Sequence, residues 1–133
     1  MGRIIVSVTV SNTLDPAHEL RFDAFVDTGA GWLTLPMAWR ARLGELPTIR
    51  TEELETADQR VIPGEVCGPV TIQIEGFRPI VSEVIFMEME PREGRYDPLL
   101  GYLALEQSSA AVDMVRHRLV AVRYVDAKTL RAA

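Results

Sequence analysis

Short segments that alternate apolar and polar residues recur along almost the whole chain. One of them reads RIIVSVTV and a later one PVTIQIEGF, and both are rich in β-branched side chains. This alternation is typical of strands that bury one face, and turn formers separate the segments at short intervals. The pattern predicts a mainly β domain with one or two short helices, built as a compact barrel or sandwich.

The clearest helix signal is PMAWRARLG, where Pro36 occupies a first-turn position and Gly44 the position of a C-terminal cap. A second short helix is expected in LLGYLALEQS, directly after a strand end. Turn formers around Asp15 and Pro16 predict the hairpin between the first two strands. Separate strands are expected in VIPGEV and PVTIQIEGF, and a closing strand pair in AAVDM and LVAVRYV.

Composition and charge limit the classes of partner and site. The 133 residues carry 19 acidic and 14 basic side chains, a formal net charge of −5. This balance provides no basic surface for nucleic acid and no attraction to an anionic membrane, and no apolar run is long enough to span one. The single cysteine, Cys67, and the two histidines show no disulfide framework and no metal-site spacing. Since a signal peptide is not recognisable either, we expect a cytoplasmic protein with one domain, residues 1–133, and no metal or cofactor.

One polar interruption, FVDTGA at residues 25–30, places a carboxylate, a hydroxyl and a glycine inside an apolar stretch. The motif lies between two expected strands, so Asp27 would project from a turn that is held at both ends. Gly29 permits a tight backbone turn and the close approach of another group. Because Asp and Gly are common turn residues, the tripeptide alone is also compatible with an ordinary turn in a β-barrel.

A second motif, DPLLGYLAL, places two leucines before Gly101. Together with FVDTGA, the WLTLP strand, the segment LETADQRVIPGEV and the closing strand pair, it resembles the retropepsin-like aspartic proteases, the single-lobe family that includes the retroviral proteases. The resemblance covers residues 4–125. It implies a closed single-lobe acid-protease β-barrel that forms dimers. It also implies an aspartic endopeptidase that binds its peptide or protein substrate in an extended conformation and uses no cofactor.

The chemistry of this class explains why a dimer is implied. Two carboxyl groups about 3 Å apart share one proton, because like charges at that separation cannot both ionise. The ionised group accepts a proton from water while the protonated group polarises the scissile carbonyl. This chain has only one Asp-Thr-Gly, so the second carboxylate must come from another chain. A two-fold homodimer would place each Asp27 beside its own copy.

The same resemblance assigns roles to further positions. Asp27 would be catalytic, Thr28 and Gly29 would support the dyad, and Ala30 and Gly31 would line the substrate groove. Structural support beneath the turn would come from Leu99, Leu100 and Gly101. The flap that closes over the substrate would comprise Ala57, Asp58, Gln59, Arg60, Val61 and Ile62.

Two departures from the family pattern favour a second interpretation, a non-catalytic dimeric peptide-binding module of the same fold. Gly31 stands where many relatives carry a polar or acidic side chain that binds the substrate backbone, and the flap turn TADQRV lacks a glycine-rich tip. We interpret the acidic residues Glu88, Glu90, Glu93 and Asp97 as a solvated loop. A position beside the groove, with a preference for basic peptides, is the alternative for these residues.

Overall fold

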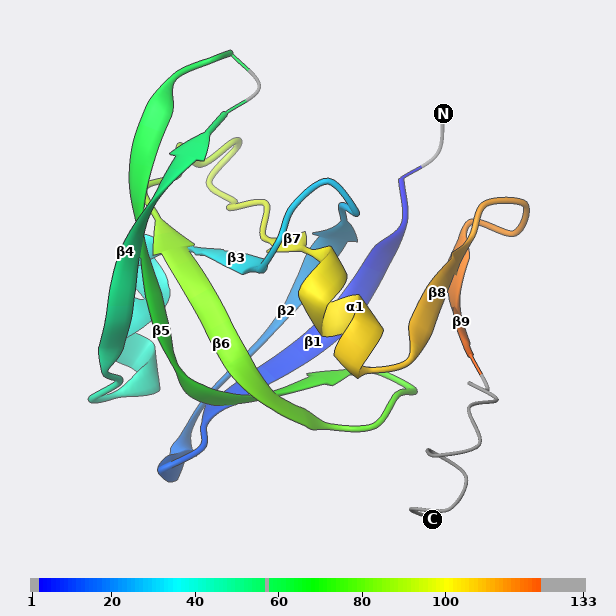
Figure 1. Ribbon diagram of the computed structural model, residues 1–133, viewed down its shortest axis with the longest axis horizontal. Helices are drawn as coiled ribbons and strands as arrows, with labels where there is room; N and C mark the ends of the chain where they lie inside the picture. Colours follow the sequence, from blue (N-terminus) through cyan, green and yellow to red (C-terminus); the bar gives the residue numbers. More distant parts are fainter. Residues whose placement is uncertain (1–2, 57, 123–133) are drawn as a thin grey trace.

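The structure is a computed structural model that describes residues 3–56 and 58–122. Its described residues form a seven-stranded sheet, a separate two-stranded hairpin and two short helices (Figure 1). The mainly β composition and the short helices predicted from the sequence are therefore confirmed. The elements in chain order are β1 (Ile5–Asn12), β2 (Asp15–Val26), β3 (Leu33–Pro36), the 3-10 helix η1 (Met37–Leu43), β4 (Thr48–Glu55), β5 (Val61–Ile74), β6 (Ile80–Met87), β7 (Leu99–Leu100), α1 (Tyr102–Gln107), β8 (Ala110–Asp113) and β9 (Arg118–Ala121).

The large sheet encloses the apolar core. Its strand order is β1-β2-β7-β3-β6-β5-β4, and β1 also pairs with β5. The inward residues of the alternating segments are fully buried, among them Val8, Ile72, Phe86 and Leu100. In this strand order the short strand β7 lies between β2 and β3, directly below the loop that joins these two strands.

The first hairpin turns earlier than the sequence pattern predicts. β2 begins at Asp15, which pairs with Asn12, so the turn comprises residues 13–14. The Asn12 side chain explains this position: its Oδ1 accepts a hydrogen bond from the Leu14 backbone N–H at 3.0 Å. Its Nδ2 donates to the Leu43 carbonyl oxygen at 2.8 Å. An Asx-type turn thus sets the reversal, and the same buried side chain fastens the hairpin to the end of η1.

The two segments VIPGEV and PVTIQIEGF form one strand, β5, of 14 residues, and the expectation of separate strands is wrong. The strand continues through Gly68 and Pro69 because its register with β6 shifts between Cys67 and Val70. Such a bulge accommodates a proline, which has no N–H for the ladder. The first half of β5 pairs with β4 and the second half with β1. The β4–β5 hairpin consequently projects as an arm at the upper end of the view in Figure 1.

Candidate active site

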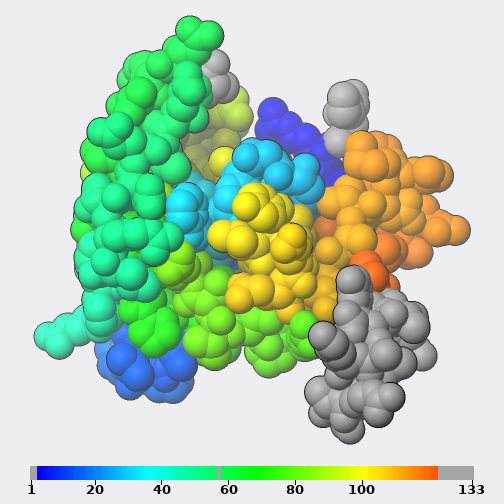
Figure 2. Space-filling view, in the orientation of Figure 1, coloured from blue at the N-terminus to red at the C-terminus, as the bar shows by residue number. Residues whose placement is uncertain are grey.

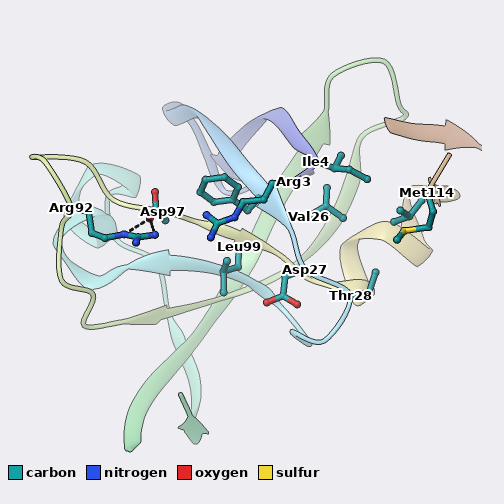
Figure 3. Close-up of a pocket in the computed structure, with 11 residues that line it drawn as sticks. Arg3, Ile4, Val26, Asp27, Thr28, Arg92, Asp97, Leu99 and Met114 are labelled. Carbon is teal, nitrogen blue, oxygen red and sulfur yellow. Dashed lines mark hydrogen bonds and ion pairs between the residues drawn. The ribbon is translucent and has the colours of Figure 1, made fainter. Parts of the chain in front are cut away.

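The loop between β2 and β3 places Asp27 in the lining of a cavity (Figure 3). Asp27 directly follows β2, and its Oδ1 accepts a hydrogen bond from the Gly29 backbone N–H at 3.0 Å. The Ala30 backbone N–H donates to the Asp27 carbonyl oxygen at 3.0 Å and closes the turn. Asp27 is half-buried, whereas Thr28 and Gly29 are exposed. The turn therefore holds the carboxylate in place and leaves it open to solvent.

Strand β7 supports this turn from below. It pairs in parallel with the end of β2, where Phe25 lies opposite Leu99, and in antiparallel with β3. The Asp27 backbone N–H donates to the Leu100 carbonyl oxygen at 3.0 Å. Because Leu100 is fully buried in the core, this bond ties the backbone of the catalytic candidate to the packed interior of the sheet.

Gly101 lies where the loop meets the start of α1. A Cβ atom at this position would lie 2.4 Å from the Trp32 carbonyl oxygen and 2.7 Å from the Ala30 carbonyl oxygen. The backbone N–H of Tyr102 donates to that Ala30 oxygen at 2.9 Å. Figure 2 shows α1, in yellow, lying directly against the pale blue residues of this region. Because Gly101 has no side chain, the helix and the loop approach closely enough to form this hydrogen bond.

The cavity beside Asp27 has a volume of about 660 Å³. Part of its wall is apolar, and four charged side chains also line it. The apolar side chains include Ile4, Val26, Leu99 and Met114, and the charged side chains are Asp27, Arg3, Arg92 and Asp97. The sequence predicted site roles for Asp27, Thr28 and Leu99, and a position beside the groove was the alternative for Asp97. It indicated no site role for Arg3, Arg92 or Met114. These come from distant parts of the chain and form no local motif.

The tip of the β4–β5 hairpin is held by polar side chains. The Thr56 backbone N–H donates to the Arg60 carbonyl oxygen at 2.8 Å, and Gln59 adopts a φ of 66°. Asp58 accepts hydrogen bonds from the Thr56 hydroxyl and, at 2.9 Å, from Arg60 Nε. The bond from Thr56 is the main cause that lowers the pKa of Asp58. Ala57, part of the expected flap, lies outside the described residues.

A second cavity, of about 280 Å³, lies between this hairpin and the loop after β6. Arg60 and Ile62 of the expected flap line it, and so do Asp97 and Leu99. Since Asp97 and Leu99 also line the Asp27 cavity, the two cavities adjoin. Part of the expected flap thus lines a cavity next to that of Asp27. The expected groove residues Ala30 and Gly31 line neither of these two cavities and instead contact the start of α1.

The β8–β9 hairpin closes another side of the Asp27 cavity with Val112 and Met114. Its turn is held by Asp113, whose Oδ1 accepts hydrogen bonds from the backbone N–H groups of Val115 and Arg116, both at 3.0 Å. The bond from the Arg116 backbone is the largest cause that lowers the pKa of Asp113 below its ordinary value. The charge of this carboxylate therefore stabilises the hairpin.

This lowered pKa predicts an acid-dependent loss of stability. The ionised Asp113 contributes stability at pH values above about 4, and the contribution disappears as the pH falls through the lowered pKa of the folded chain. Asp113→Asn should therefore reduce the free energy of unfolding at neutral pH, and the difference from wild type should shrink in acid. Urea denaturation from about pH 7 to about pH 3 measures this. A difference that stays constant over this range would contradict the assignment.

Comparison with known proteins supports the architecture. No family model matches the chain, and no curated protein matches it in sequence. Among solved structures, the EIAV protease in complex with the inhibitor HBY-793 superposes with a TM-score of 0.62 at 19% identity, covering 85% of this chain and 94% of that chain. The chain has a retropepsin-like fold. At this level of identity the likeness shows the fold alone, so the catalytic, flap and dimer roles stay predictions.

Among residues 3–56 and 58–122, one other carboxylate lines the cavity of Asp27. The other carboxylate of its cavity, Asp97, is paired with the Arg92 guanidinium at 3.2 Å. Chemistry that needs two carboxyl groups sharing a proton would therefore require a group that the described residues of this cavity do not supply. Among the described residues, no helix is both long enough and apolar enough to cross a membrane.

Proposed function

We propose that this chain is an aspartic endopeptidase that acts as a homodimer on peptide segments bound in an extended conformation. The observation that carries the proposal is the Asp27 carboxylate, which lines a cavity and projects from a turn that β7 holds in place. The likeness of the fold to a retroviral protease supports it. The pairing of β1 with β5 fits the closed single-lobe barrel of this class.

In the proposed mechanism each subunit supplies one Asp27 carboxyl group to a dyad that shares one proton. The ionised group takes a proton from a water molecule, whose oxygen attacks the scissile carbonyl carbon. The protonated group donates to the carbonyl oxygen, and the C–N bond breaks as a proton passes to the leaving amine. The hydrogen bond from the Gly29 N–H to Asp27 Oδ1 orients the carboxylate. No metal or cofactor takes part.

The surface around the cavity suits an isologous contact. Met114 and Val115, at the tip of the β8–β9 hairpin, are 66% and 88% exposed, and Met114 lines the Asp27 cavity. The hairpin, in orange, projects from the body of the molecule in Figure 2. Exposed apolar side chains beside an incomplete site fit the burial of one copy against another. The exposed Thr28 would lie near the two-fold axis, with its hydroxyl bonded across it.

The remaining roles are those that the resemblance to the retropepsin-like proteases implies. Residues 58–62 and Ala57 would close over the bound peptide and exclude water. Ala30 and Gly31 would leave room for the peptide backbone, which adds strand-like hydrogen bonds. Leu99, Leu100 and Gly101 would keep the catalytic turn fixed below it.

Sedimentation equilibrium together with a cleavage assay tests the proposal. We expect a dimer, cleavage of an unfolded protein between about pH 4 and pH 6, where a shared-proton dyad is favoured, and inhibition by a pepstatin-like compound. A dimer that binds the inhibitor without cleaving would instead support the non-catalytic peptide-binding module. A monomer at every concentration, without binding or cleavage, would leave a β-barrel with an ordinary Asp-Thr-Gly turn.

A further inference from the structure

We propose that Asp97 is a specificity-determining residue that selects a Lys or Arg side chain of the substrate beside the scissile bond. The position beside a scissile bond rests on the proposed function. The recognition of a cationic side chain is independent of hydrolysis, because it requires only that the groove bind a peptide.

Asp97 occupies the junction of the two adjoining cavities. It lies just before β7, and it lines both the cavity of Asp27 and the cavity below the β4–β5 hairpin. Its side chain is 38% exposed. In Figure 3, Asp97 lies at the end of the Asp27 cavity that is remote from Met114. A substrate side chain that leaves the backbone near Asp27 and enters the second cavity would therefore pass Asp97.

The wall beside Asp97 is apolar. Leu99 lines both cavities, and Met87 and Met89 line the one below the hairpin. An apolar stem followed by a carboxylate matches a Lys or Arg side chain, which buries its methylene groups and keeps its charged end near polar atoms. An apolar side chain of the same length would remove water from the carboxylate without replacing the lost hydrogen bonds.

Asp97 has a vacant acceptor for such a ligand. Arg92 donates from Nε at 3.3 Å and from Nη2 at 3.2 Å, and both bonds reach Oδ2. Within residues 3–56 and 58–122, Oδ1 of Asp97 has no hydrogen-bond partner. The Arg92 side chain is 69% exposed, and an exposed ion pair of this kind is weak and rearranges readily. A substrate cation can therefore bind Oδ1 with Arg92 in place or displaced.

The charges around the second cavity favour a cation. Glu88 and Glu90 line it together with Asp97, and Arg60 is the basic residue of its wall. Arg60 is already paired with Asp58, at 2.9 Å. On the other side, Arg3 lines the Asp27 cavity with its guanidinium 5.1 Å from the centre of the Phe25 ring. The acidic part of the groove is thus the part below the hairpin, where Asp97, Glu88 and Glu90 line the same cavity.

Binding of two uncleavable peptides tests this proposal. Both peptides carry a reduced amide in place of the scissile bond. One has Lys and the other norleucine at the two positions that flank this bond, so that each Asp97 of a dimer meets one of these side chains. By calorimetry we expect the Lys peptide to bind wild type about tenfold more tightly, with a preference that falls as salt is added. Asp97→Asn should abolish the preference for Lys. Asp97→Lys should instead prefer a third peptide that carries Glu at the same two positions.

A matched control removes an equivalent carboxylate elsewhere. Glu75→Gln breaks an exposed ion pair with Arg21, outside both cavities, and should retain the preference for Lys. Equal binding of both peptides, no binding of either, or an Asp97→Asn variant that still prefers Lys would overturn the proposal.

The same measurement separates the two proposals, because it requires no hydrolysis. Selective binding without cleavage of the corresponding amide peptide would reject the endopeptidase and retain the role of Asp97. Cleavage with no preference for Lys or Arg would retain the endopeptidase and reject that role.

Discussion

Asp27→Asn is expected to lower kcat for peptide hydrolysis by at least about a thousandfold, with the fold and the dimer unchanged. An amide cannot take a proton from the attacking water, so the variant removes the chemistry. It retains an Oδ1 that accepts the hydrogen bond now donated by the Gly29 N–H. Since Asp27 is only half-buried, the exchange of a carboxylate for an amide leaves no buried charge without a partner. Cleavage of a quenched fluorescent peptide, with circular dichroism as the test of folding, measures the effect.

The matched control is Asp23→Asn, the same substitution on the same strand. Asp23 is exposed on β2 and lies outside the Asp27 cavity, so cleavage should continue at the wild-type rate. Cleavage by Asp27→Asn at a rate near that of wild type would contradict the assignment of the catalytic group.

Mixing the variant with wild type tests whether two carboxyl groups are needed. With free exchange of subunits in an equal mixture, about one quarter of the dimers carry two Asp27 residues, so activity should fall to about one quarter of that of wild type at the same total concentration. If each chain worked alone, the activity would fall only to about one half. The second result would reject the shared dyad even if Asp27→Asn itself were inactive.

Strands were predictable from the sequence where one local pattern determined them. The alternation in β1 and in the second half of β5 predicted strands that bury one face, and in the structure Val8 and Ile72 of these strands are fully buried. The errors arose where a side chain or a neighbouring strand overrode the local signal. Asn12 moved the first turn by accepting a bond from the Leu14 N–H. The pairing of β5 with β6 carried one strand through Pro69, although a proline by itself indicates a break.

The candidate site was predictable only in part, for a related reason. Asp27 and Leu99 belong to short motifs, and the structure places both beside the same cavity. Arg3 and Met114 line that cavity too, but they meet it through the packing of the first strand and the β8–β9 hairpin, which no local pattern specifies. Asp97 was interpreted as part of a solvated loop because its neighbours are charged, and a position beside the groove was only the alternative. Its position at the junction of two cavities depends on the pairing of β7 with β2 and β3.

Gly101→Ala is expected to reduce the free energy of unfolding by about 3 kcal/mol. The new Cβ would lie 2.4 Å from the Trp32 carbonyl oxygen and 2.7 Å from the Ala30 carbonyl oxygen. Both atoms belong to backbone, so no side chain can rotate to relieve the clash, and the loop must move away from α1. That movement would stretch the hydrogen bond from the Tyr102 N–H to Ala30. Urea denaturation measures the loss of stability.

Gly31→Ala is the matched control, since a Cβ at Gly31 would meet no atom within 4 Å. The free energy of unfolding should change by less than about 0.5 kcal/mol. Equal losses for both variants would show that the loop resists any added methyl group, and close packing against α1 would then not be the cause. In a Gly101→Ala variant that still folds, the displaced turn should also lower kcat more than the loss of folded protein explains, because a shift of about 1 Å in a catalytic group costs about a hundredfold in rate. If the Gly101→Ala variant is destabilised but has a normal kcat, Gly101 supports the fold and does not position Asp27.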